Sequence, residues 1–91
     1  MSGYGRTVGF DAELGKLMAA WRREHGLTQE RLGAAIGVDQ TVISRLESGE
    51  RRIDVHLLLT TLGALDLELA DVAEEIASLV KEERPPSLWQ R

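Results

Sequence analysis

The stretch of residues 27–53, LTQERLGAAIGVDQTVISRLESGERRI, constrains the fold more than any other part of the chain. Its apolar residues fall into two short groups with spacings of three or four, as on one face of a helix. These residues are Leu32 and Ile36, then Ile43 and Leu46. Gly37 lies between the groups, where a sharp turn favours a residue that adopts a positive φ without strain. The pattern predicts two short helices joined by a tight turn.

The ends of these two helices carry signals of their own. Thr28 and Asp39 each precede a helix, and a side-chain oxygen at that position can cap the helix N-terminus. Gly49 follows the second helix as a typical stop signal. We therefore expect helices at roughly 29–36 and 40–47, the arrangement called a helix-turn-helix.

Three further helices are expected from apolar residues at helical spacing. They cover roughly residues 11–24, 55–64 and 68–83, and Asp54 is placed to cap the second of them. The first contributes Leu14, Leu17, Met18 and Trp21 to the core, and the second contributes Val55, Leu58, Leu59 and Leu62, followed by Leu65, with Leu57 off that stripe. The predicted fold class is all-α, a compact five-helix domain at 10–83 between an N-terminal arm (1–9) and a C-terminal tail (84–91).

Over roughly residues 14–67 the chain resembles the lambda-repressor-like (Xre/Cro-type) DNA-binding family, with at least eight positions matched at fixed spacing in LTQ…L…G…IS..E.G. Gly33 departs from the family, which more often has alanine there. Glycine suits a close helix crossing but costs about 0.5–1 kcal/mol relative to alanine. The resemblance implies binding to double-stranded DNA through the second helix of the motif.

That helix presents polar side chains opposite its apolar face, where base edges of the major groove would lie. Glutamine can bond to adenine, arginine to guanine, and threonine to a thymine methyl or a phosphate. Val42 stays ambiguous between a thymine contact and the edge of the core. By the resemblance, Gln29 meets a phosphate at its helix N-terminus, and the arginines of the following loop are expected to contact the DNA backbone. The expected DNA-binding residues are Gln29, Gln40, Thr41, Ser44, Arg45, Arg51 and Arg52.

Arg22 and Glu47 occupy positions where members of that family have a partly buried ion pair between the first and third helices. The resemblance therefore implies a structural role for Glu47, since a carboxylate beside phosphates would repel them. A direct phosphate contact by Arg22 is the competing interpretation.

Composition argues against several classes of function. The 91 residues include no cysteine, so disulfides and thiolate metal sites are excluded. His25 and His56 lie far apart without ligand-like neighbours, and we expect solvated or partly packed side chains, no metal and no cofactor. No nucleophile–base pair or phosphate loop is visible, so an enzyme is not expected. No apolar run reaches the ~18 residues of a membrane span and no signal-peptide core is present, so we expect a cytoplasmic protein without membrane contact.

The formal net charge of −4 is unevenly distributed. Residues 1–53 carry eight Lys or Arg and seven Asp or Glu, whereas residues 54–91 carry three and eight. Phosphate binding depends on the local field within about 8–10 Å at physiological salt, so the acidic half is expected to face away from DNA.

The predicted fifth helix has more apolar residues than one small core needs: Leu69, Val72, Ala73, Ile76, Ala77, Leu79 and Val80. Either it folds back over the first and fourth helices, or part of it packs against a second copy. We expect a homodimer through this helix, because a single recognition helix reads only ~4–5 base pairs and dimers bind two half-sites. Its acidic residues, Glu74, Glu75, Glu82 and Glu83, are expected to be solvated.

Trp89 in the C-terminal tail leaves three interpretations open: docking on the molecule or its dimer, binding of another protein, or disorder. The sequence as a whole predicts a transcriptional regulator, specifically a dimeric repressor that reads a near-palindromic operator. The alternatives are an antitoxin that binds both DNA and a toxin protein, and a protein-interaction module that does not bind DNA.

Overall fold

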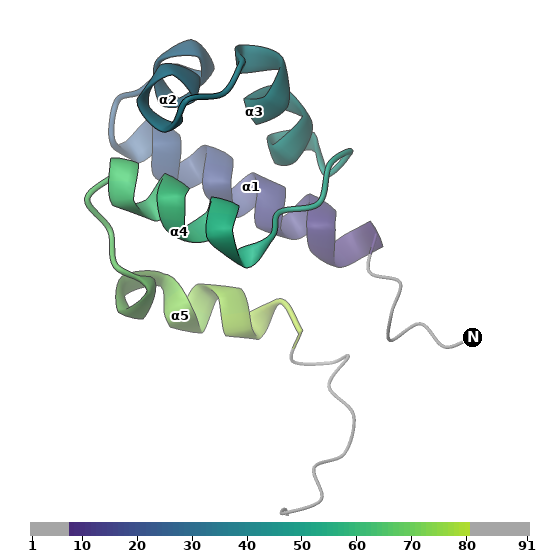
Figure 1. Ribbon diagram of the computed structural model, residues 1–91. Helices are drawn as coiled ribbons and strands as arrows, with labels where there is room; N and C mark the ends of the chain where they lie inside the picture. The colour runs from purple at the N-terminus through teal and green to yellow at the C-terminus, as the bar shows by residue number, and fades with distance from the viewer. Residues whose placement is uncertain (1–7, 81–91) are drawn as a thin grey trace, which may run out of the picture.

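The computed structural model describes residues 8–80, which form five helices (Figure 1). The helices are α1 (Val8–Glu24), α2 (Gln29–Ile36), α3 (Gln40–Ser48), α4 (Val55–Ala64) and α5 (Leu69–Ser78). The predicted all-α class is therefore confirmed, and α2 and α4 have the predicted bounds. Helix α1 begins three residues before the predicted start, and α5 ends at Ser78 rather than near Glu83, which lies outside the described residues.

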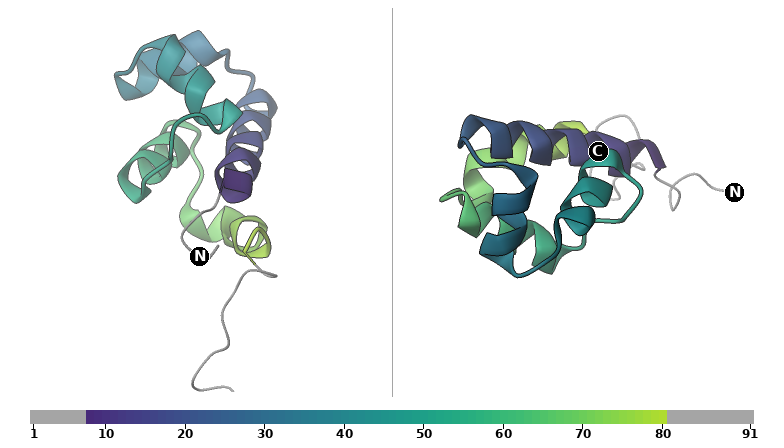
Figure 2. Two further views of the ribbon diagram at one scale, coloured as in Figure 1. Left: turned by 90° about the vertical axis from the view of Figure 1, so that its right-hand side faces the viewer. Right: turned by 90° about the horizontal axis from the view of Figure 1, so that it is seen from above.

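The helices are arranged in three layers, seen from two directions in Figure 2. Helices α2 and α3 form the first layer, α1 and α4 the second, and α5 the third. The core between these layers contains Leu14, Met18, Trp21, Leu32, Ile43, Leu46, Leu62, Leu65 and Val72. Trp21 is 3% exposed, which confirms its predicted place in the core. None of the helices within residues 8–80 is long and apolar enough to cross a membrane.

The predicted helix ends are largely present. The backbone N–H of Arg31 donates to Oγ1 of Thr28 at 3.0 Å, and that of Leu57 donates to Oδ1 of Asp54 at 2.7 Å. Asp39 lies at the N-cap position of α3, but its side chain makes no capping hydrogen bond. Gly37 ends α2 in the left-handed conformation, with φ at 81°. The turn between α2 and α3 is therefore set by residues that the sequence identifies.

Two glycines bring parts of the backbone into close contact. A Cβ on Gly15 of α1 would lie 2.5 Å from the carbonyl oxygens of Leu46 and Glu47, so α1 and α3 cross at a glycine. A Cβ on Gly33 would lie 2.6 Å from the carbonyl oxygen of Val38, in the turn after α2. The small residue predicted at Gly33 is thus required by the turn, whereas the closest crossing of α1 and α3 depends on Gly15.

The predicted inner face of α4 is wrong, because the helix is rotated about its axis by roughly the angle between successive residues. Val55 and Leu59 are 70% and 46% exposed, whereas Leu57 and Leu58 pack against the core. Thr61, a polar residue that the apolar pattern does not include, is fully buried on the inward side. Because Leu57 and Thr61 are four residues apart, they share the face that turns inward.

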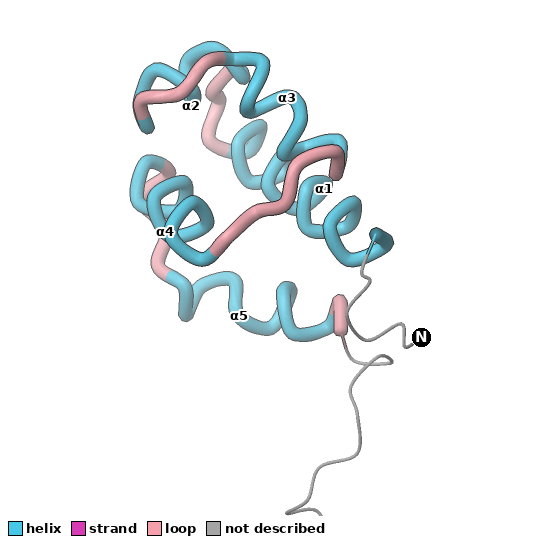
Figure 3. The backbone as a smooth tube through the Cα atoms, turned by 45° about the vertical axis from the view of Figure 1, so that its right-hand side comes forward, coloured by secondary structure: helices cyan, strands magenta, loops and turns pink. Residues whose placement is uncertain are grey.

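Helix α5 lies below α4 in Figure 3, and one side of it packs against the core of the monomer. Val72 is buried, and Ile76 and Leu79 are half-buried against the core. The indole nitrogen of Trp21 donates to Oε1 of Glu75 at 2.9 Å, so this carboxylate holds α5 against α1 instead of being only solvated as predicted. The interpretation that this helix folds back over the domain is therefore correct for these three apolar residues, whereas Leu69, Ala73 and Ala77 of the same stripe are exposed.

Candidate nucleic-acid interface

Helix α3 has an apolar inner face and a polar outer face, as predicted. Ile43 and Leu46 are fully buried. The side chains expected to reach bases are all exposed: Gln40, Thr41, Ser44 and Arg45. Val42 is half-buried and packs against the core, which favours its role at the core edge. The four polar residues thus lie together on the solvent side of one helix, where a major groove could receive them.

A nearly buried ion pair fixes α3 against α1. Nε of Arg22 lies 2.6 Å from Oε2 of Glu47, and a terminal nitrogen of the same guanidinium donates to Oε1 at 3.0 Å. The remaining terminal nitrogen donates to the carbonyl oxygen of Leu27 at 2.8 Å. The hydrogen bond to Glu47 raises the pKa of Arg22 above its ordinary value, although burial opposes the shift. The predicted structural pair is confirmed. The competing phosphate contact by Arg22 is wrong, because its nearly buried guanidinium already donates to Glu47 and Leu27.

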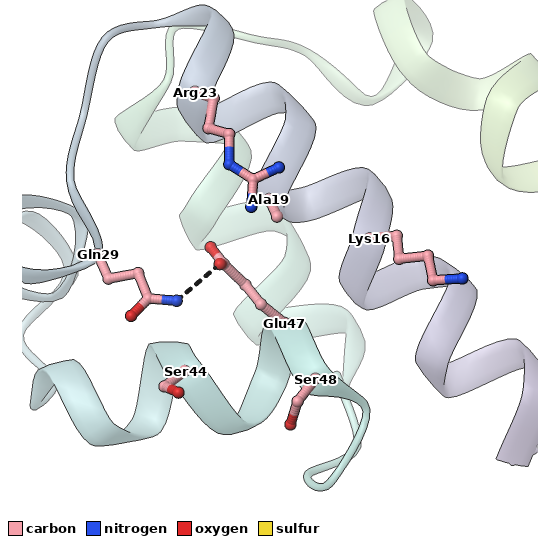
Figure 4. A pocket seen from close by; sticks show the side chains of 7 residues that line it. All are labelled: Lys16, Ala19, Arg23, Gln29, Ser44, Glu47 and Ser48. Atoms are coloured by element: carbon pink, nitrogen blue, oxygen red, sulfur yellow. Dashed lines mark hydrogen bonds between the residues drawn. The ribbon is translucent and has the colours of Figure 1, made fainter.

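A chain of hydrogen bonds extends from this pair to α3's outer face. Nε2 of Gln29 donates to Oε1 of Glu47 at 2.9 Å (Figure 4). Nε2 of Gln40 donates in turn to Oε1 of Gln29 at 3.3 Å. A carboxylate only accepts, so Gln29 must offer Glu47 its amide N–H and present its oxygen to Gln40. The ion pair therefore fixes which way both amides point.

This chain of hydrogen bonds was not predicted from the sequence. Gln29 was expected at a helix N-terminus and Gln40 on the recognition face, but they are eleven residues apart and only the turn brings them together. The sequence did contain a signal for this contact. Gln29 and Gln40 are the first residues of the two predicted helices, and the predicted turn brings those two residues to the same side of the motif.

The two arginines that follow α3 are exposed, as a phosphate contact would require. The backbone N–H of Arg51 donates to the carbonyl oxygen of Arg45 at 3.1 Å, which holds the loop close to α3. Nε of Arg52 lies 3.9 Å from Oδ2 of Asp11, and its side chain remains 71% exposed. Part of the Arg52 charge is thus balanced by α1, which the sequence did not indicate.

The histidines are on the surface. His25 is exposed, and its Nδ1 lies 2.9 Å from the carbonyl oxygen of Trp21, so Nδ1 carries the proton. His56 is also exposed at the start of α4. Within residues 8–80, no three His, Asp or Glu side chains gather in a way that could hold a metal ion.

Comparison with known proteins agrees with this geometry. The family model described as Helix-turn-helix matches residues 18–72, so the chain belongs to that family, in its Xre or lambda-repressor-like branch. The HTH-type transcriptional regulator y4dJ of Sinorhizobium fredii is 38% identical over 65 residues, which are 68% of this chain and 84% of y4dJ. The class is thus that of DNA-binding transcriptional regulators.

Two solved structures show a similar fold. A crystal structure of the clp gene regulator ClgR from Corynebacterium glutamicum has a TM-score of 0.70 at 29% identity and covers 81% of this chain and 80% of ClgR. The restriction-modification controller protein C.AhdI from Aeromonas hydrophila has a TM-score of 0.62 at 28% identity, and the match covers 79% of this chain and 99% of C.AhdI. Both names describe proteins that control genes or gene systems.

Proposed function

We propose that this chain is a dimeric repressor that binds a near-palindromic operator and reads each half-site through α3. The observation that carries the proposal is the exposed polar face of α3, held in a fixed orientation by the ion pair of Arg22 and Glu47. Exposed polar residues are common, but four on one short helix whose other face is fully buried form a surface of the size that enters a major groove.

Gln40 is the proposed reader of adenine. Its amide nitrogen gives one hydrogen to Gln29 and keeps the second, and its carbonyl oxygen faces no protein donor among residues 8–80. These two groups match adenine N7, which accepts, and N6, which donates. Because Gln29 is itself oriented by Glu47, the amide of Gln40 is set in the orientation for adenine before DNA arrives.

The other exposed residues of α3 supply the remaining base contacts in this proposal. Arg45 can donate two hydrogen bonds to guanine, and Thr41 and Ser44 can contact a thymine methyl, a base edge or a phosphate. Gln29, Arg51 and Arg52 are the proposed contacts to the DNA backbone, which position the protein without reading sequence.

Dimerisation is proposed through the outer surface of α4 and the start of α5. Among the described residues, the most exposed large apolar side chains are Val55, Leu59 and Leu69, at 70%, 46% and 47%. Val55 and Leu59 are four residues apart, so they lie on one side of α4, and a contiguous exposed apolar patch often marks an interface. A two-fold dimer would present two copies of α3 to half-sites about 34–36 Å apart. Residues 84–91, including Trp89, lie outside the described residues, and the antitoxin interpretation has no support among the relatives.

The test is selection of bound duplexes from a random pool at a stated salt concentration. We expect enrichment of a near-palindrome, and Arg45→Ala should cost about 1–3 kcal/mol on it and relax the preference at one position per half-site. Arg31→Ala is the matched control, because it removes an exposed positive charge from α2. An Arg45→Ala preference identical to that of the wild type would contradict the assignment of α3.

A further inference from the structure

An open pocket of about 320 Å³ lies between α1 and α3, beside the polar face of α3 (Figure 4). It is lined by Lys16, Ala19 and Arg23 of α1, Gln29 of α2, and Ser44, Glu47 and Ser48 of α3. Lys16 and Arg23 leave α1 at opposite ends of the pocket, with the small Ala19 between them. Ser44 belongs to both the pocket and the proposed base-reading face, so the two surfaces are continuous.

The pocket has a positive character. Lys16 and Arg23 are seven residues apart, so they lie on the same side of α1 with a rise of about 10 Å between them. Among the described residues that line the pocket, the one carboxylate is that of Glu47, and it is already bonded to Arg22. Nζ of Lys16 lies 3.2 Å from Oε2 of Glu13, but both side chains are exposed, so solvent weakens this ion pair and Glu13 only partly offsets the charge of Lys16. Within residues 8–80 no carboxylate lies at ion-pair distance from Arg23.

The pocket also offers neutral hydrogen-bond donors. The amide nitrogen of Gln29 gives one hydrogen to Glu47 and keeps the other, and Ser44 contributes an exposed hydroxyl. The hydroxyl of Ser48 is already used, since it donates to the carbonyl oxygen of Arg45 at 3.2 Å. Two cations with an amide and a hydroxyl between them are the donor set that phosphate oxygens accept.

We propose that this pocket receives backbone phosphates of the bound duplex, with Lys16 and Arg23 as their ligands, so that α1 is part of the DNA-binding surface. The proposal rests on the proposed function, because α3 must enter the groove for a phosphate strand to pass beside it. Two cations about 10 Å apart along α1 can each meet a phosphate of one strand, which agrees with the change of about two units in salt slope expected below. The contact adds affinity and no sequence preference.

The experiment compares the wild type with Lys16→Gln, Arg23→Gln and the double variant on the selected operator and on an unrelated duplex, at several salt concentrations. Removing one cation that binds a phosphate should reduce the slope of log affinity against log salt by about 0.9, so the slope of the double variant should fall by about two units on both duplexes. Arg31→Gln, which removes an exposed charge that does not line the pocket, should change the slope less. Lys16→Arg keeps the charge and should keep the slope.

The outcomes separate this proposal from the proposed function. If the wild type selects an operator and the double variant keeps its salt slope, the phosphate contact is wrong while the function of α3 stands. If the wild type binds no duplex, both fail. Calorimetric titration with inorganic phosphate gives a further check: binding at micromolar phosphate that the double variant abolishes would identify a site for a free anion and overturn the assignment to DNA.

Discussion

Among single residues, Glu47 connects three helices, since its carboxylate accepts from Arg22 of α1 and from Gln29 of α2. Its removal leaves the guanidinium of Arg22 nearly buried without its partner, which typically costs ~3–5 kcal/mol. Glu47→Ala should therefore lower the free energy of unfolding and the DNA affinity together, and a double-mutant cycle with Arg22→Ala should give a coupling energy of about 1–3 kcal/mol. Additive effects of the two substitutions would show that the pair does not stabilise α3.

Thr61 offers a stabilising substitution. Its side chain is fully buried on α4, and its hydroxyl has no hydrogen-bond partner among residues 8–80. A buried polar group without a partner costs about 1–3 kcal/mol, so Thr61→Val should raise the free energy of unfolding by about 1 kcal/mol, measured from the urea midpoint. Thr60→Val is the matched control, since Oγ1 of Thr60 donates to the carbonyl oxygen of His56 at 2.7 Å and its loss should not stabilise. Equal changes for the two variants would refute the argument.

At the scale of elements, the crossing of α1 and α3 depends on Gly15. A Cβ there would meet two carbonyl oxygens at 2.5 Å, so the backbones must separate to admit alanine. The strain of such overpacking, typically 1–3 kcal/mol, exceeds the gain in helix propensity of about 1 kcal/mol, so Gly15→Ala should lower the melting temperature. Gly63→Ala is the control on α4, because no atom of the described part of the chain lies within 4 Å of a Cβ there, and it should stabilise slightly. A Gly15→Ala protein as stable as Gly63→Ala would mean that the crossing is not tight.

The same elements explain how far the sequence could be interpreted. The bounds of α2, and the orientation of α3, were predictable because caps, the Gly37 turn and helical spacing are local features. The inner face of α4 and the role of α5 were not, because both depend on packing: Thr61 is buried by its neighbours, and Glu75 is held by an indole 54 residues away in the chain. For the candidate site, the residue types were predictable, whereas the hydrogen bonds from Glu47 to Gln40 required the helices to be placed in space.

For the molecule as a whole, the uneven charge of the sequence has a counterpart in the arrangement of the helices. The six Arg and one Lys among residues 8–53 belong to α1, α2, α3 and the loop after α3. Residues 54–80 carry only acidic charge, which lies on α5, just before α4, and between α4 and α5. Helix α5 lies in the layer farthest from α2 and α3, so its acidic residues are separated from the proposed DNA surface. A modest net field on the DNA side implies modest affinity per half-site, which favours binding by a dimer.

The dimer is tested on the exposed apolar side chains of α4 rather than on α5, because Ile76 packs against the core and its substitution would also disturb the monomer. Leu59→Asp places a charge on the proposed interface without entering the core, and light scattering at tens of micromolar should show a shift from dimer to monomer. Ala34→Asp adds the same charge to an exposed position on α2 and should leave the dimer intact. The Leu59→Asp monomer should lose most operator affinity, because it binds one half-site at a time whereas a dimer binds both at once. It should keep its half-site preference, because α3 is unchanged. A wild-type protein that is monomeric at that concentration would remove the interface, and each α3 would then have to read its site alone.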